Sequence, residues 1–296
     1  MATWMLAWVA LAAAPVDVGC DGALEAAVAD VRGGGALRLA AGCVFEGPLS
    51  IVAEGDVTLI GGPGTLLTEG VVVDGPGAVR LVGLRVTSDS VALSKRGPGA
   101  LVLEGVGLEG ERALHVEGPG AVTASRSTFV GRDTAVWIQA ARDLRIVDCT
   151  VIGEQVALVT RDLTGEAHVT GSRLRVSGRG DASAAVFLHG PGRVTLTDSR
   201  IEFVSRTARP APAVVLVAVG EAVLDENVIV GDGVGVVFER RGTVGCNRFD
   251  GILQHATGPH VRLCGRDLPA GSLDWRRRAA SPQVVASLDR GGSTAQ

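Results

Sequence analysis

Cysteine side chains can form disulfides or bind metal ions, and four of the five cysteines in this chain fall into two local pairs. Cys20 and Cys43 flank the first predicted helix, whereas Cys246 and Cys264 flank the last of a series of repeats. In an oxidising compartment, two cysteines so placed favour a local disulfide that closes one end of the fold. We therefore expect one disulfide in each pair and an unpaired Cys149.

Histidine offers a second chemistry at the later pair. His255 and His260 lie between Cys246 and Cys264, so the four side chains could also form a Cys2His2 zinc site. An exported chain favours the disulfide over zinc. We expect no metal ion and no other cofactor.

The start of the chain bears on which compartment the cysteines meet. Residues 4–14, WMLAWVALAAA, form an apolar run too short to span a bilayer, and ALA at 10–12 offers a small-x-small cleavage site. Residues 1–14 therefore resemble an export signal, although no Lys or Arg precedes the run and Pro15 follows it. GC at 19–20 would suit lipid attachment but lacks a Leu-containing box before it. The sequence predicts a secreted, periplasmic or cell-surface protein without a membrane span.

Composition excludes some partners and favours one class of fold. The chain has 296 residues, a formal net charge of −4 and 46% hydrophobic residues, which suffices for a sizeable core. Nucleic acid is not an expected partner, because no basic surface is available to track phosphates. The 42 glycines, with only 3% aromatic residues and no tyrosine, suit a fold of many tight turns between thin strands.

One short amphipathic helix is predicted over residues 21–32, DGALEAAVADVR. Its apolar face consists of Leu24, Ala27, Val28 and Val31. Asp21 is the expected N-cap, and the three glycines at 33–35 end the helix. The hydrophobic period then falls to two, which predicts strands.

The strands recur in a repeat. GPGA stands at 75–78, 97–100 and 118–121, at intervals of 22 (97 − 75) and 21 (118 − 97) residues, and GPGR follows at 190–193. Aligned segments begin with AVRLVGLRV at 78–86 and end with RGTVGCNRF at 241–249. A fixed period of this size is typical of a solenoid whose coils each contribute one unit to a shared core.

Three columns of this alignment predict what faces inward. The fourth column is apolar: Leu81, Leu103, Ala124, Ile146, Val169, Leu196, Leu224 and Val244. The ninth is apolar too: Val86, Leu108, Phe129, Val151, Leu174, Ile201, Ile229 and Phe249. The seventh turns polar: Leu84, Val106, Ser127, Cys149, Ser172, Ser199, Asn227 and Asn247. We expect the apolar columns to stack as core ladders and the polar column to hydrogen-bond the bending backbone, with Cys149 as a packed member rather than a nucleophile.

The GPG element is predicted to form a corner between two strands of a coil. In a type II turn, the glycine before proline is extended, proline presets the next position, and the second glycine supplies the positive φ. In the GPGR segment at 190–193, Gly192 is expected to supply this positive φ.

Coils of 21–22 residues with three short strands, a helix before the first coil, and stacked aliphatic and Asn/Ser ladders resemble the right-handed parallel β-helix proteins of the pectin-lyase-like superfamily. The resemblance covers roughly residues 21–265. It implies an all-β fold, a right-handed parallel β-helix over residues 20–265, with an irregular tail at 266–296. The superfamily includes polysaccharide lyases, polygalacturonases, epimerases, tailspikes and adhesins, so the fold alone does not select an activity.

In that superfamily, substrates lie across the outer face of the first strand of each coil. The resemblance therefore implies that the outward residues are Val72 and Asp74, Ala92 and Ser94, His115 and Glu117, Trp137 and Gln139, Phe187 and His189, and Val215 and Val217. At 156–160 either Ala157 and Val159 or Leu158 and Thr160 face outward. Longer loops at 175–184 and 202–213 would overhang Phe187 and His189.

An overhung cleft with aromatic and polar walls could hold a sugar, because an exposed indole stacks on pyranose C–H bonds. The residues expected to bind a polysaccharide or cell-surface glycan are His115, Glu117, Trp137, Gln139, Phe187 and His189. The opposing interpretation is an apolar stripe that contacts another chain or lies under the loops.

Catalysis is the competing hypothesis. An enzyme acting on a polyuronate would have His189, Arg161 and Glu117 as its acid–base groups. Asp74 and Glu117 are two coils apart, on the order of 10 Å, and cannot share a calcium ion. A third hypothesis is a purely structural or adhesive rod.

Overall fold

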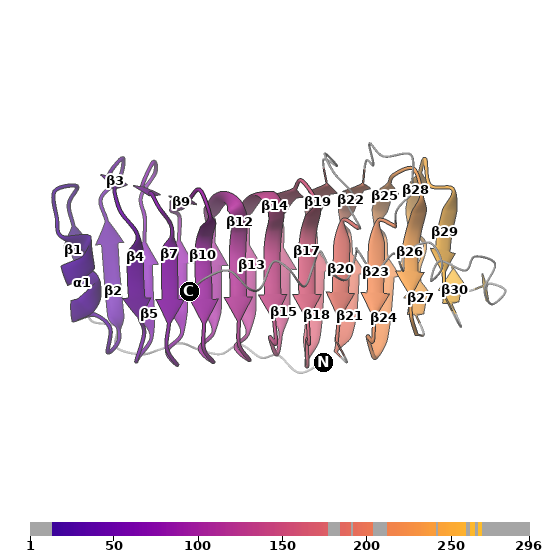
Figure 1. Ribbon diagram of the computed structural model, residues 1–296, viewed down its shortest axis with the longest axis horizontal. Coiled ribbons are helices and arrows are strands. Elements are labelled where there is room, and N and C mark those ends of the chain that lie inside the picture. Colours follow the sequence, from indigo (N-terminus) through magenta and orange to yellow (C-terminus); the bar gives the residue numbers. More distant parts are fainter. Residues whose placement is uncertain are drawn as a thin grey trace.

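The protein is a parallel β-solenoid of about ten coils with one helix at its beginning (Figure 1). The computed structural model describes residues 14–176, 184–190, 192–203, 212–240, 242–258, 261–263 and 266–267. Its strands form a 13-stranded and an 18-stranded sheet. Except for the last pair, β30 with β31, the strands pair in parallel, each with the strand one coil away.

The 13-stranded sheet is face A of the solenoid. Its strands are β1 (Val16–Val18), β2 (Gly35–Leu39), β5 (Val57–Ile60), β8 (Val79–Val82), β11 (Leu101–Glu104), β13 (Val122–Ser125), β15 (Leu144–Val147), β18 (Glu166–Thr170), β21 (Arg193–Thr197), β24 (Glu221–Asp225), β27 (Gly242–Val244), β30 (Val261–Leu263) and β31 (Arg266–Asp267).

The 18-stranded sheet supplies two faces that meet in its two longest strands, β12 (Gly107–Glu117) and β14 (Thr128–Gln139). Face B consists of the first parts of these two strands with β3 (Val44–Phe45), β6 (Leu66–Leu67), β9 (Arg85–Thr87), β16 (Thr150–Gly153), β19 (Arg173–Val176), β22 (Arg200–Phe203), β25 (Val228–Val230) and β28 (Arg248–Asp250). Face C consists of their last parts with β4 (Leu49–Val52), β7 (Val71–Asp74), β10 (Val91–Arg96), β17 (Val156–Arg161), β20 (Val186–His189), β23 (Val214–Val217), β26 (Val234–Phe238) and β29 (Gln254–Thr257). Each full coil runs through C, A and B in turn, which confirms three strands per coil.

The helix α1 (Leu24–Asp30) covers the first coil (Figure 1). Leu24 and Val28 are buried in the core, as the amphipathic pattern predicted. The predicted cap was wrong: the N-cap is Ala23, and no side chain caps it. Asp21 precedes the cap by two residues, where the chain still turns through a hydrogen bond from the Gly22 amide to the Gly19 carbonyl.

A disulfide joins Cys20 to Cys43, whose Cα atoms are 5.1 Å apart. It ties the segment before α1 to the segment before β3 and confirms the first predicted pair. Cys246 has a free, exposed thiol, and Cys264 lies outside the residues that the structure describes, as does His260, so the second pair stays a prediction.

The predicted apolar ladders form the core. The fourth-column residues lie on face A and the ninth-column residues on face B, and all of them are buried except Phe249, which packs against the core while partly exposed. Stacking one coil on the next therefore buries a continuous column of aliphatic side chains.

The corner from face A to face B is a single left-handed residue in each of seven successive coils. These residues are Gly83, Gly105, Arg126, Asp148, Gly171, Asp198 and Glu226, with φ between 50° and 62°. The residue that follows each of them belongs to the seventh column. The polar side chains of this column form hydrogen bonds with the bending backbone, as predicted. The Ser172 hydroxyl, for example, accepts from the Cys149 amide (3.1 Å) and donates to the Thr170 carbonyl (2.9 Å).

The corner from face C to face A contains the GPG element, and the predicted turn type was wrong there. Positive φ falls on the first glycine, 85° at Gly97, rather than on the second. The second glycine is needed for a different reason: a Cβ on Gly99 would lie 2.0 Å from the Gly77 carbonyl oxygen of the preceding coil. Successive corners thus stack backbone against backbone, which only glycine permits.

The corner from face B to face C is lined by buried alanines: Ala92, Ala113, Ala135, Ala157, Ala185 and Ala213. Each alanine precedes another inward residue, so the alternation of a strand is interrupted here. For this reason the prediction that Ala92 faces outward was wrong: Ala92 is buried, and Ser94 is the residue in register with Val72.

Candidate functional site

The candidate site lies on the outer face of C, where β10, β12, β14, β17 and β20 are adjacent strands (Figure 1). Two rows of outward side chains cross these strands along the solenoid axis. The aromatic row is His115, Trp137, Val159 and Phe187. The polar row is Arg96, Glu117, Gln139, Arg161 and His189.

These rows bring together every residue predicted for the sugar site. Of the two alternatives at 156–160, the structure selects Val159, because Leu158 and Thr160 point inward beside Val136 and Ile138. The outward partner of Val159 is Arg161, the next position of the polar row, rather than Ala157. The loop segments 177–183 and 204–211 lie outside the described residues, so the overhang stays a prediction.

Trp137 occupies the centre of the aromatic row, but its expected exposure was wrong. Only 5% of the residue is accessible. The guanidinium carbons of Arg112 and Arg161 lie 5.4 and 4.8 Å from the ring centroid, and His115 meets the indole edge-on at 6.4 Å between centroids. The indole ring therefore holds two arginines over it by cation–π contacts, and it does not offer a free surface on which a sugar could stack.

The polar row, in contrast, is accessible. Glu117 and His189 expose 47% and 38% of their side chains, and Gln139 and Arg96 are also exposed. The imidazole of His115 lies 3.2 Å from a Glu117 carboxylate oxygen, and that of His189 lies 3.6 Å from Asp162. Each of these two histidines thus has a carboxylate within 4 Å of its ring.

Electrostatics hold His115 in its neutral form near neutral pH. Burial lowers the pKa of His115, and the positive charges of Arg112 and Arg96 lower it further, against the opposing effect of Glu117. Burial also raises the pKa of Asp133, although Arg112 at 4.0 Å opposes the rise.

The expected acid–base groups lie in one row, where Arg161 and His189 are on adjacent strands but Glu117 is further away. Glu117, Gln139 and Arg161 are in consecutive register, and His189 follows Arg161 in the next coil. With strands about 4.8 Å apart, Glu117 and His189 are separated by roughly 14 Å across the sheet. Within the described ranges, no group of three His, Cys, Asp or Glu side chains could hold a metal ion.

Arg112 and Arg96 are the members of the site that sequence reasoning missed. Arg112 lies where β12 continues from face B into face C, at a register shift between Gly110 and Arg112. Arg96 went unnoticed because the alanine corner displaced the expected register of β10 by two residues. An (i, i+2) alternation continued from Ser94 reaches Arg96, whereas alternation from His115 does not reach Arg112, because the register shifts between Gly110 and Arg112.

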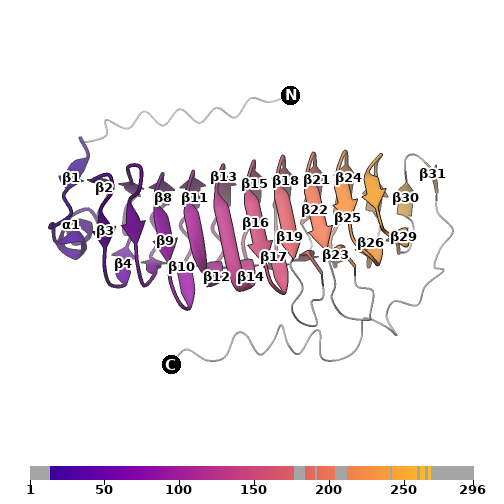
Figure 2. The same ribbon diagram turned by 90° about the horizontal axis from the view of Figure 1, so that it is seen from above.

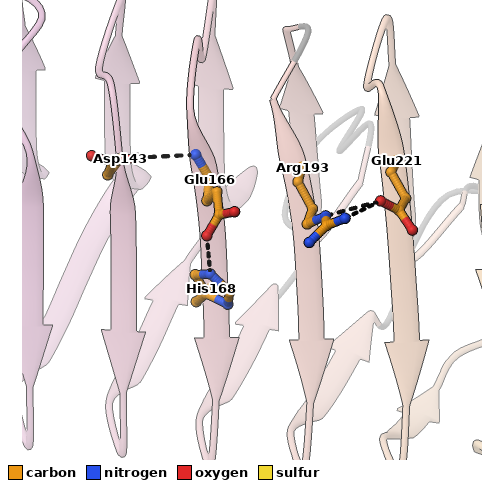
Figure 3. Close-up of polar contacts among 5 residues, drawn as sticks. All are labelled: Asp143, Glu166, His168, Arg193 and Glu221. Carbon is orange, nitrogen blue, oxygen red and sulfur yellow. Dashed lines mark hydrogen bonds and ion pairs between the residues drawn. The ribbon is translucent and has the colours of Figure 1, made fainter. Parts of the chain in front are cut away.

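Face A also has a row of charged side chains, at the starts of its strands, but these residues pair with one another (Figure 3). The Glu166 carboxylate lies 2.9 Å from the His168 imidazole, and an Asp143 carboxylate oxygen accepts the Glu166 amide at 3.2 Å. Arg193 forms an ion pair with Glu221 one coil further on. His168 points outward and is partly exposed. Exposed pairs of this kind contribute little to stability.

Among the helices in the described part of the chain, none has the length and apolar character needed to cross a membrane. The sequence matches no family model, no curated protein and no solved structure.

Proposed function

We propose that this is an exported β-helix protein that binds a polysaccharide along the polar row of face C. The observation that supports it is the row itself, in which Glu117, Gln139, Arg161 and His189 follow one another at one residue per strand. They combine carboxylate, amide, guanidinium and imidazole groups, which suits the hydroxyl and carboxylate groups of sugars.

The direction of the row suits a linear polymer. Because the row runs across strands about 4.8 Å apart, a chain lying along the solenoid axis would meet a new hydrogen-bonding side chain at every coil. Several weak contacts on one chain raise the overall affinity through effective concentration. A small ligand would meet only one or two of them.

The aromatic row would assist this binding by positioning side chains of the polar row and by offering additional ring surface. Trp137 holds Arg161 in place by the cation–π contact at 4.8 Å, so part of the cost of ordering a long side chain is met before the ligand arrives. Phe187 and His115, which are partly exposed, offer the ring surface that the buried indole does not.

The resemblance to the pectin-lyase-like superfamily favours the same face, because substrates of that superfamily lie there. The predicted export signal and the Cys20–Cys43 disulfide are compatible with a protein that meets glycans outside the cytosol. The acidic side chains of the row do not converge: Asp74, which precedes Arg96 by one coil, lies two strands and about 10 Å from Glu117, so the row does not favour hydrolysis.

Affinity electrophoresis of the full chain tests the proposal, with gels that contain pectin, alginate, xylan or peptidoglycan-derived glycans. His189→Ala should abolish the retardation seen in one of these gels. His168→Ala is a matched control, because His168 is a similarly exposed histidine that is also paired with a carboxylate but lies on face A.

Three other outcomes are informative. Equal mobility in every gel contradicts binding and favours the structural rod. Equal loss of retardation in both variants contradicts a site on face C. Conversion of the retained polymer into unsaturated or reducing-end products would replace binding by a polyuronate lyase or hydrolase activity.

A further inference from the structure

A second cluster of charged side chains lies on face B, away from the polar row. Arg173, Arg175, Arg200 and Glu202 are outward residues of the adjacent strands β19 and β22. Arg173 is in register with Arg200, and Arg175 is in register with Glu202. Two like charges directly opposite each other on neighbouring strands are unfavourable unless an anion lies between them.

The Glu202 carboxylate is one such anion, and it neutralises part of the positive charge. Its carboxylate lies 3.0 Å from Arg173 and 3.7 Å from Arg175, and it accepts a short hydrogen bond from Arg200. The side chain of Glu202 is only 12% exposed, whereas those of the three arginines are 46–51% exposed. The carboxylate therefore lies beneath three guanidinium groups that face the solvent.

The cluster has an excess of positive charge and of hydrogen-bond donors. Three guanidinium groups share one carboxylate, which leaves a formal charge of +2 (3 − 1). Arg175 and Arg200 approach Glu202 through Nε, and within the described part of the chain their terminal nitrogens form no other hydrogen bond or ion pair. Those nitrogens form the fork that matches an oxyanion.

Other arginines of face B lack this excess. Arg85, which belongs to the same row as Arg173 and Arg200, pairs one-to-one with Glu109, and Arg248 pairs with Asp250. The grouping of three arginines around one carboxylate is thus specific to Glu202 and is not a general property of face B. Among the residues that the structure describes, two positive charges of this cluster have no counterion, which a purely structural ion pair would not need.

We propose that Arg173, Arg175 and Arg200 bind an oxyanionic group, a carboxylate, sulfate ester or phosphate, with Glu202 holding the guanidinium groups in position. The site would fix one charged substituent of an acidic polymer, or a free anion, on face B. It is independent of the polysaccharide site on face C, which lies on another face of the solenoid.

Binding measurements by isothermal titration calorimetry on the full chain test this proposal, with dextran sulfate, polygalacturonate and inorganic phosphate as separate probes. Arg175→Gln should weaken binding of at least one probe about tenfold, because one hydrogen bond to a charged group is lost. Arg85→Gln removes a similar charge from the same row and should leave that affinity unchanged. The probe that responds identifies the group: sulfate ester, carboxylate or free phosphate.

Arg175 has the longest contact with Glu202, so its substitution is the least harmful to folding, and thermal unfolding of each variant checks this. Arg200→Gln provides a second test and should weaken the same probe. Absence of binding to all three probes, or equal affinity of wild type, Arg175→Gln and Arg200→Gln, would overturn the proposal. Loss of polygalacturonate binding in Arg161→Ala alone would assign that polymer to face C and overturn the face B site for carboxylates.

Discussion

Glu202 is held in its charged form by the arginines around it. Burial acts to raise the pKa of Glu202, but hydrogen bonds from Arg200 and Arg173 and the charges of these residues outweigh burial and lower the pKa below 4.5. Because the carboxylate is bound more favourably when charged, its ionisation stabilises the folded state. Its removal would leave three clustered guanidinium groups without their shared counterion.

Glu202→Gln should therefore lower the free energy of unfolding at neutral pH by about 1–3 kcal/mol. Glu109→Gln, which breaks an exposed one-to-one pair with Arg85, should cost below about 1 kcal/mol.

A group with a depressed folded pKa contributes stability above its unfolded pKa of about 4.5, and this contribution is lost as the pH falls through the folded value. Urea unfolding at neutral and at acidic pH should show the difference between wild type and Glu202→Gln shrinking in acid. Equal cost of the two substitutions would contradict this description of Glu202.

At the scale of one strand and its corner, the seventh-column ladder supplies partners for backbone groups that the bend leaves unpaired. Asn227, which is 1% exposed, accepts from the Ser199 amide at 3.0 Å and donates to the Leu196 carbonyl at 2.7 Å. Cys149 has the same position in an earlier coil, and its thiol donates to the Val147 carbonyl at 3.2 Å. Burial raises the pKa of the Cys149 thiol, which disfavours a nucleophilic thiolate.

Asn227→Ala should lower the free energy of unfolding by about 1–3 kcal/mol or more, because it leaves a buried donor and a buried acceptor without partners. Cys149→Ser should cost less than about 1 kcal/mol, since serine is the residue at the same place in the two adjoining coils and can make the same bonds. Chemical denaturation of both variants measures these values. If Cys149→Ser proves as damaging as Asn227→Ala, the ladder is not held by hydrogen bonds as described.

The repeat predicted the elements better than it predicted the corners between them. Aligned columns identify which side chains stack, because burial of a ladder requires the same apolar character in every coil. They do not reveal backbone dihedral angles, so the positive φ of Gly97 was assigned to Gly99. They also gave no sign that Lys95 points inward, where its ammonium group donates to the Arg96 carbonyl at 2.7 Å and burial lowers its pKa.

On the scale of the whole molecule, the fold and the shared rows of face C followed from the sequence, but Arg112, Arg96 and the accessible surface of these rows did not. Register along face C depends only on strand spacing, and for this reason His115, Trp137 and Phe187 share a row as expected. The covering of Trp137 depends on Arg112 and Arg161, which come from two other coils and reach it through long side chains. Such contacts between coils have no signature in the periodicity.

The solenoid is long, and α1 covers the end of its first coil (Figure 2). The Cys20–Cys43 disulfide lies at the same end. Stacked coils stabilise one another as neighbours, so a row of side chains along the axis is held on a rigid frame. A binding row on such a frame needs little rearrangement when a ligand arrives. This rigidity is the reason to test the polar row by single substitutions.

The most direct test is the dissociation constant of the glycan retained in affinity gels, measured for the full chain with Arg161→Ala and Arg145→Ala. Arg145 is an exposed arginine of face A, whereas Arg161 lies in the polar row between Gln139 and His189. Binding along this row predicts that Arg161→Ala weakens the affinity about tenfold or more, because a charged hydrogen-bond donor is lost, while Arg145→Ala leaves it unchanged. Equal affinities for both variants and wild type would contradict a polysaccharide site on face C.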